Sequence, residues 1–346
     1  MKCVSPVGAL SACCLLAGAC VRPQVVGGIA PASARAEPSY TEAIAAVEIR
    51  QVQDDSVAVR AGRSILMTHG ARTPRVYVLL HGFSDAPTQF ERVGAAFFAD
   101  GDNVYIPRLP HHAERSAPLR ALARVRAEEL AAFGDSTANI ARGLGDTVVV
   151  VGLSAGGVIA GWMAQSHASV YRAVLIAPAI APGSVSDDDG AGLVLLASRL
   201  PDVERARTPD TTRLENVQGI TTRGLAQLLL LGHRVYDQSA LEAPGAKRIV
   251  FLLNQRDRTV NENASIDLAQ RWFDRGATVS VYRFGNGAHL PHNVMELTSR
   301  GGNVELVYPV VEALARGATP PEGVPLLDVP CRGFWCSVRR WARNRS

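Results

Sequence analysis

Apolar positions along the chain follow two alternating patterns between about residue 56 and residue 316. Short runs rich in Val, Ile and Leu are typical of strands that are buried on both faces of a parallel sheet. Between them, apolar residues recur at three- and four-residue spacing, which is typical of amphipathic helices. The first pattern predicts strands at 56–62, 64–70, 75–83, 103–109, 148–153, 172–180, 247–257 and 277–285. The second pattern predicts helices at 87–101, 119–144, 261–276 and 303–317, and another helix that begins at residue 155.

The alternation of strands with helices predicts an α/β fold class, with a mostly parallel central sheet and helices on both faces. The chain has 346 residues, of which 47% are hydrophobic and 20% are charged. This length and composition suit one large α/β domain, or two small ones, with a sizeable core. We place the main domain at residues 56–316.

Residues 183–245 interrupt the alternation, because they contain no clear strand. After an acidic, glycine-rich start, two apolar helices are predicted at 193–200 and 223–238. Insertions of this length between strands are often functional, so we interpret the segment as a helical lid over a binding site. The alternative is a helical excursion that fills one side of the core. The second helix has an apolar stripe formed by Leu225, Leu228, Leu229 and Val235.

The stretch VVVVGLSAGGVIAGW, residues 148–162, places one serine between a strand and a helix. Four consecutive valines predict a buried strand, and the small apolar residues after Ser154 predict a helix packed closely on the sheet. Gly152 and Gly156 leave room where side chains would collide in a tight turn, and with Ser154 they form a G-x-S-x-G pentad. The pentad is common by itself, but in this strand–turn–helix context it indicates a serine nucleophile.

A serine nucleophile needs a base, and the base needs a carboxylate that orients it. Asp257 ends the predicted strand 247–257 and is the candidate acid, with a turn-forming role as the alternative. His289 and His292 follow the strand at 277–285, in GNGAHLPHN, and either is a candidate base. Pro291 restricts the backbone next to His292 and so favours a defined direction for that residue.

Two backbone N–H groups are expected to bind the oxyanion of a tetrahedral intermediate. They belong to Phe83, at the end of the strand 75–83, and to Ala155, directly after the serine. His111 and His112 follow another strand end, where a loop position without a catalytic role is the favoured interpretation. No cluster of carboxylates or cysteines accompanies the histidines, so the sequence predicts no metal and no cofactor.

The motifs HGFSDAPTQF, YIPRLPHH, GLSAGG, RDRTV and LPHN follow one another in matching strand contexts over about residues 60–316. With these motifs the chain resembles the α/β-hydrolases of the carboxylesterase, monoacylglycerol lipase and lysophospholipase type. The resemblance implies an α/β-hydrolase fold and the chain order Ser, Asp, His for the catalytic residues. It favours His292 as the base, because HNVMEL fits the family's histidine context better than HLPHN does. The chain departs from the relatives at His111-His112-Ala113, where they often have Gly-His-Gly.

The resemblance also implies a serine hydrolase that cleaves carboxylic esters of glycerol or small alcohols through an acyl-enzyme on Ser154. A thioesterase or acyltransferase with the same triad is an alternative, because unrelated reactions share this elbow. Another is a non-catalytic lipid-binding protein on the hydrolase scaffold. The net charge of +4 comes almost entirely from scattered arginines, so the expected partner is a small acyl ester and not a nucleic acid.

Residues 1–20 have the layout of a secretory signal, with one lysine followed by an apolar run that is short for a membrane span. The segment also resembles a bacterial lipoprotein signal in which Cys20 is lipidated. We therefore expect export to the periplasm or a lipid anchor in the bacterial envelope. Residues 21–55, rich at first in Pro, Ala and Ser, are interpreted as a linker and lead-in.

The C-terminal basic tail, residues 317–346, contains a second group of cysteines. Cys331 and Cys336 could form a small-loop disulfide in an exported protein. Arginines and tryptophans follow in the sequence SVRRWARNRS and around it, a combination that suits an anionic membrane surface. A solvated tail is the alternative interpretation.

Overall fold

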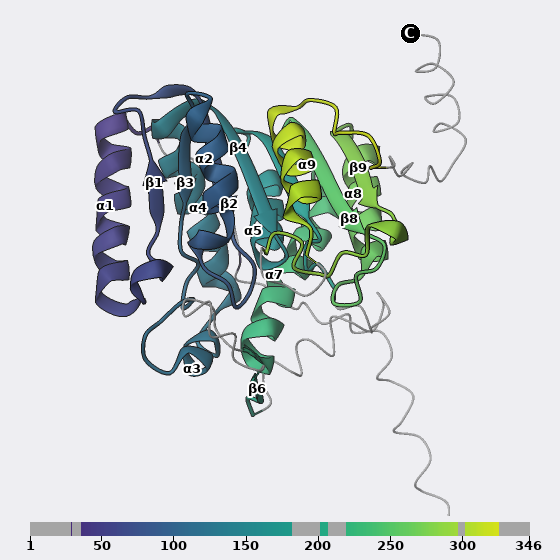
Figure 1. Ribbon diagram of the computed structural model, residues 1–346, viewed down its shortest axis with the longest axis horizontal. Helices are drawn as coiled ribbons and strands as arrows, with labels where there is room; N and C mark the ends of the chain where they lie inside the picture. The colour runs from purple at the N-terminus through teal and green to yellow at the C-terminus, as the bar shows by residue number, and fades with distance from the viewer. Residues whose placement is uncertain (1–28, 30–35, 182–200, 207–218, 297–301, 325–346) are drawn as a thin grey trace, which may run out of the picture.

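The computed structural model describes residue 29 and residues 36–181, 201–206, 219–296 and 302–324. A seven-stranded sheet runs through its centre in the order β1-β3-β2-β4-β5-β8-β9 (Figure 1). The edge strand β1 pairs antiparallel with β3, and the other neighbouring strands are parallel, which confirms the predicted fold class. The strands are β1 (Ile65–Met67), β2 (Thr73–Leu80), β3 (Asn103–Ile106), β4 (Gly145–Leu153), β5 (Val170–Ile176), β8 (Arg248–Asn254) and β9 (Thr278–Phe284).

The valine run of β4 lies in the middle of the sheet and is buried from both sides. Strand β4 pairs along its length with β2, so that Leu80 lies opposite Gly152. Because parallel strands end at the same edge of a sheet, this register brings His81 and Ser154, the residues that follow β2 and β4, to one edge.

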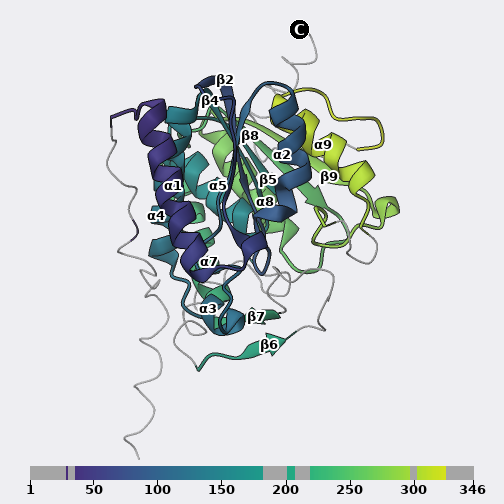
Figure 2. The ribbon, with the colours of Figure 1, turned by 60° about the vertical axis from the view of Figure 1, so that its left-hand side comes forward.

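Helices cover both faces of the sheet, as the alternation predicts. Helices α2 and α9 contact each other on one face, and α4, α5 and α8 cover the other, with α1 packed on α4 and α7 packed on α5 (Figure 2). The predicted helix 119–144 is interrupted, since α3 ends at Leu122 and α4 begins at Ala127. The helices are α1 (Tyr40–Val57), α2 (Glu91–Ala99), α3 (Pro118–Leu122), α4 (Ala127–Leu144), α5 (Ala155–Ser166), α7 (Thr222–Leu241), α8 (Glu262–Asp274) and α9 (Val304–Arg316).

Helix α1 corrects the interpretation of residues 21–55 as a linker and lead-in for the part from residue 40 onward. It begins with a capping box, in which Ser39 and Glu42 each bond the other's backbone N–H. Val47 is fully buried, and Asp54 pairs with Arg108 at 2.7 Å, so that the helix belongs to the α/β domain. The helix was not predicted because its apolar residues form no regular stripe: Ile49, for example, is 60% exposed.

The prediction of a strand at 56–62 is also wrong. Val57 ends helix α1, Ala58 forms one isolated bridge to Glu114, and Arg60–Gly62 is a short 3-10 helix. A Cβ atom on Gly62 would lie 2.4 Å from the Cβ of Ala113, so the chain passes too close to its neighbour for a regular strand with side chains on both faces. The strand predicted at 64–70 is present as β1.

Within 183–245, the described residues contain helix α7 and two short strands that were not predicted. Strands β6 (Glu204–Ala206) and β7 (Gly219–Thr221) pair antiparallel outside the main sheet. The predicted helix 193–200 lies outside the described residues. The apolar stripe of α7 divides between two environments: Val235 is buried in the domain core, whereas Leu225, Leu228 and Leu229 line a cavity.

The predicted signal segment with Cys20, and the cysteines and arginines of the C-terminal tail, lie outside the described residues. Among the residues that are described, no helix combines the length and the apolar character needed to cross a membrane.

Candidate active site

Ser154 occupies a strained turn between β4 and α5. Its backbone has φ 53° and ψ −107°, a region that residues with a side chain seldom adopt. The turn is held by hydrogen bonds that its N–H groups donate to carbonyl oxygens at the ends of the two neighbouring strands. The N–H of Ser154 donates to Ile176 O at 2.9 Å, and the N–H of Gly156 donates to His81 O at 3.1 Å. The sheet therefore holds the serine hydroxyl above the carboxyl ends of β4 and β5.

The two glycines of the pentad are required by close backbone contacts. A Cβ atom on Gly152 would lie 2.1 Å from the carbonyl oxygen of Gly156. A Cβ atom on Gly156 would lie 2.0 Å from the carbonyl oxygen of Leu80. Both distances are far below van der Waals contact, so any other residue would force the strand and the helix apart at the turn that presents Ser154.

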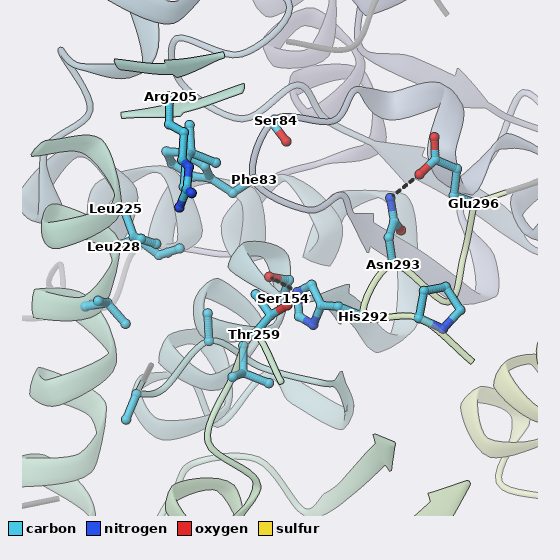
Figure 3. A pocket seen from close by; sticks show the side chains of 16 residues that line it. Phe83, Ser84, Ser154, Arg205, Leu225, Leu228, Thr259, His292, Asn293 and Glu296 are labelled. Carbon is cyan, nitrogen blue, oxygen red and sulfur yellow. Dashed lines mark hydrogen bonds between the residues drawn. The ribbon is translucent and has the colours of Figure 1, made fainter. Parts of the chain in front are cut away.

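Ser154, His292 and Asp257 form one chain of hydrogen bonds. With the ring proton on Nδ1, His292 donates to Asp257 Oδ2 at 2.6 Å. The Ser154 hydroxyl donates to His292 Nε2 at 2.9 Å (Figure 3). The carboxylate of Asp257 is 3% exposed, and its Oδ1 accepts the N–H of Thr259 at 2.8 Å. This geometry allows the imidazole to take the proton of the serine while the carboxylate faces the positive charge that results.

The loop that carries His292 is clamped to the end of β8. The amide of Asn254, the last residue of that strand, donates to Leu290 O and to Pro291 O, each at 3.0 Å. Sequence analysis did not select Asn254. Its buried position next to Asp257 is a signal that only the folded chain reveals.

His289 lies away from the serine. It is exposed, its backbone has φ 51°, and its Nδ1 accepts a hydrogen bond from Arg256. Of the two candidate bases, the structure therefore brings His292 and not His289 to Ser154.

The expected oxyanion donors lie next to the serine. Phe83 follows Gly82 at the end of β2, and Ala155 is the first residue of α5. In the described part of the chain, neither N–H donates a hydrogen bond. Both are thus available to an oxygen atom held near Ser154.

A buried polar network connects the loop after β2 to the loop of His292. Gln89 accepts the N–H of Gly82 at 2.8 Å and donates to Asn293 Oδ1 at 2.9 Å. Gln89 and Asn293 both donate to one oxygen of Asp85, whose side chain is almost fully buried. The network thereby fixes the spacing between Gly82 and Asn293, which are the sequence neighbours of Phe83 and His292. Sequence analysis missed all three side chains, because buried polar contacts between distant loops have no local pattern.

Three further histidines near the site do not contact the serine. His81 is fully buried: its Nδ1 donates to Gly82 O and its Nε2 accepts the N–H of Leu109. Burial lowers its pKa well below 6.5. Burial also lowers the pKa of His112 to about 4. His111 pairs with Glu129 at 3.1 Å, which raises its pKa.

A cavity of about 670 Å³ opens in front of the serine (Figure 3). Its walls come from the loop after β2, the β6–β7 pair, helix α7 and the histidine loop. Most of the lining is apolar, with a few charged and polar groups at the sides. The lining residues are Phe83, Ser84, Ser154, Ala179, Ala181, Arg205, Ile220, Leu225, Leu228, Leu229, Thr259, Val260, Pro291, His292, Asn293 and Glu296. Within the described residues, no group of three or more His, Cys, Asp or Glu side chains is placed to hold a metal ion.

Comparison with known proteins agrees with the fold. A model of the α/β hydrolase family matches residues 77–299, which is more than half of the chain. The chain belongs to the α/β-hydrolase family. No curated protein sequence matches it at a significant level.

Solved structures similar to this chain include enzymes that act on lipids. One belongs to work on LipS and LipT, two metagenome-derived lipolytic enzymes. It has a TM-score of 0.57 and 14% identity, over 75% of this chain and 99% of that chain. The monoacylglycerol lipase of Paleococcus ferrophilus has a TM-score of 0.52 and 15% identity, over 74% of this chain and 98% of that chain. A soluble variant of the monoglyceride lipase of Saccharomyces cerevisiae has a TM-score of 0.54 and 12% identity, over 75% of this chain and 92% of that chain. At these identities the likeness establishes the fold.

The family match identifies the chain as an α/β-hydrolase, and the solved structures share its fold.

Proposed function

We propose that this protein is a serine hydrolase that cleaves carboxylic esters through an acyl-enzyme on Ser154. The observation that carries the proposal is the hydrogen-bond chain from Ser154 through His292 to Asp257 at the wall of an open cavity. A serine, a base and an orienting carboxylate in hydrogen-bond contact are the parts that acyl transfer to a hydroxyl requires.

In the first half of the reaction, Ser154 Oγ attacks the carbonyl carbon of the ester while its proton moves to His292 Nε2. The oxyanion of the tetrahedral intermediate accepts hydrogen bonds from the N–H groups of Phe83 and Ala155. The intermediate then collapses. The bond to the alcohol oxygen breaks, and His292 returns the proton to that oxygen as the alcohol leaves.

In the second half, a water molecule replaces the alcohol. His292 takes a proton from the water as it attacks the acyl-enzyme, and returns the proton to Ser154 Oγ as the carboxylic acid leaves. Asp257 holds the imidazole with a proton on Nδ1 throughout, so that Nε2 is free to accept a proton at the start of each half.

The proposed substrates are acyl esters of glycerol or small alcohols. Support comes from the apolar wall that Leu225, Leu228 and Leu229 place beside the serine, which suits an acyl chain. The names of two structural neighbours, a monoacylglycerol lipase and a monoglyceride lipase, point to the same class of ester.

A series of 4-nitrophenyl esters from acetate to palmitate tests the proposal. We expect wild-type hydrolysis to increase from acetate to longer chains, and Ser154→Ala to abolish it. Leu225→Ser tests the apolar wall, because Leu225 is only partly buried and its replacement spares the core. The variant should lose more activity on the longer esters than on acetate. Leu241→Ser, at the 73% exposed far end of the same helix, is the matched control. If the wild type cleaves none of the esters, the proposal is wrong.

A further inference from the structure

Arg205 is an arginine in the wall of the substrate cavity. It lies on β6 opposite Ile220 of β7, and both residues line the cavity. Figure 3 shows Arg205 on the side of Leu225. Its side chain is exposed, and within the described residues no side chain or carbonyl group forms a hydrogen bond or an ion pair with it. The guanidinium group is therefore available to a ligand in the cavity.

The strand that carries Arg205 is tied to the first turn of helix α7. The N–H of Val203 donates to Thr222 Oγ1 at 2.9 Å, and the N–H of Thr222 donates to Val203 O at 3.1 Å. The N–H of Arg223 donates to Asp202 Oδ1 at 2.9 Å. Since α7 packs against the domain core, these bonds give Arg205 a defined place beside the cavity.

The nearest acidic side chain in the sequence does not neutralise Arg205. Consecutive residues of a strand point to opposite faces, and Glu204 pairs with Arg120 at 3.9 Å. The described residues that line the cavity include one carboxylate, that of Glu296, which accepts a hydrogen bond from the amide of Asn293 at 2.7 Å. Figure 3 shows Arg205 and Glu296 on opposite sides of the serine.

We propose that Arg205 binds an anionic oxygen group of the substrate, so that the preferred substrates are acyl esters that carry a carboxylate or phosphate away from the ester bond. This inference rests on the proposed esterase function. The planar guanidinium group offers paired N–H donors that match the oxygens of either anion. Glu296 repels the same anion on the other side, so the charged end of the substrate points toward the β6–β7 pair and the uncharged end toward the histidine loop.

Two matched pairs of esters test the proposal and distinguish the two positions of the charge. Mono-4-nitrophenyl adipate and 4-nitrophenyl hexanoate differ by a carboxylate at the acyl end. Hexanoyl glycerol phosphate and hexanoyl glycerol differ by a phosphate at the alcohol end. Arg205→Gln removes the proposed contact, and Arg205→Lys keeps the charge without the paired donors. Arg120→Gln removes a neighbouring, 81% exposed charge that does not line the cavity, and is the matched control.

In at least one pair, we expect the wild type to have the higher kcat/KM on the anionic ester. In that pair, Arg205→Gln should lower the ratio of kcat/KM on the anionic ester to kcat/KM on the neutral ester about tenfold. This is the loss expected for a hydrogen bond between charged groups that solvent weakens. Arg205→Lys should give an intermediate ratio, and Arg120→Gln the wild-type ratio. The proposal is overturned if Arg205→Gln leaves the ratio unchanged in both pairs, or if Arg120→Gln lowers it equally.

Binding of the same esters to Ser154→Ala, measured by calorimetry, separates this inference from the esterase proposal. The anionic ester of the responding pair should bind Ser154→Ala about tenfold more tightly than the double variant Ser154→Ala/Arg205→Gln. If the wild type cleaves no ester but this difference is found, the esterase proposal fails and the anion site stands. If the wild type cleaves the neutral esters but the difference is absent, the anion site fails and the esterase proposal stands.

Discussion

Replacing Asn293 by alanine tests whether the two loops beside Ser154 must be held at a fixed spacing. The amide of Asn293 accepts from Gln89 at 2.9 Å and donates to Asp85 at 3.1 Å, and Gln89 in turn binds the N–H of Gly82. The variant keeps His292 and the oxyanion donors but cuts the contact between their loops.

The expected magnitude follows from the bonds that are lost. A hydrogen bond to a charged group contributes roughly 2 kcal/mol, and a neutral one about 1 kcal/mol. Asn293→Ala loses the neutral bond to Gln89 and the bonds to the carboxylates of Asp85 and Glu296, so it should lower the free energy of unfolding by about 3–5 kcal/mol. Looser placement of His292 against the oxyanion donors should lower kcat by about 10- to 100-fold, since about 1.4 kcal/mol corresponds to a factor of ten.

The assay measures kcat and KM for a short 4-nitrophenyl ester, together with urea denaturation of each variant. Asn286→Ala is the matched control, because Asn286 is exposed in the short 3-10 helix Asn286–Ala288 and lies outside the network. We expect kcat to fall with a smaller change in KM for Asn293→Ala, and wild-type values for the control. A folded Asn293→Ala protein with wild-type kcat would refute the role given to the network.

Three further outcomes are expected. His292→Gln should lose nearly all esterase activity, whereas His289→Gln should keep activity within about tenfold of the wild type, because only the His292 ring contacts the serine; the reverse result would exchange the two roles. Gly156→Ala should destabilise the protein and lower kcat, because its Cβ would lie 2.0 Å from Leu80 O; wild-type thermal stability would contradict this packing. Between pH 6.5 and pH 4 the unfolded chain binds a proton at His112 that the folded chain does not, because burial lowers the pKa of the folded residue to about 4. As the pH is lowered from 6.5 to 4, this residue should therefore decrease the free energy of unfolding by about 3 kcal/mol. In His112→Gln, the free energy of unfolding measured by denaturation should depend less steeply on pH.

The central part of the fold could be predicted because its signals are local. Four valines in β4 have to be buried on both faces of a sheet, and glycines are required around Ser154 because a Cβ atom there would lie 2.0–2.1 Å from Gly156 O or Leu80 O. Each candidate site residue lies at or just after a strand end, and parallel strands bring such ends to one edge. The pattern therefore sufficed to select Ser154 and Asp257 and to limit the base to His289 or His292, of which the family resemblance favoured His292. The structure brings Ser154, Asp257 and His292 into one hydrogen-bond chain.

The parts that were missed depend on contacts between distant segments. Helix α1 is stabilised by contacts such as the pairing of Asp54 with Arg108, and its own residues form no apolar stripe. Strands β6 and β7 are three residues long, too short for a periodic pattern. Gln89 and Asn293 are 204 positions apart in the sequence, so no local pattern reveals their contact.

Covalent labelling with a fluorophosphonate tests the central claim, that Ser154 is the nucleophile of a working triad, most directly. The probe forms a bond to an activated serine Oγ and releases fluoride, and intact-mass measurement with peptide mapping locates the adduct. We expect one adduct on Ser154 of the wild type, with esterase activity lost in proportion to labelling, and none on folded Ser154→Ala. A folded wild type that stays unlabelled, or an unmodified Ser154 in labelled and inactivated protein, would contradict the account.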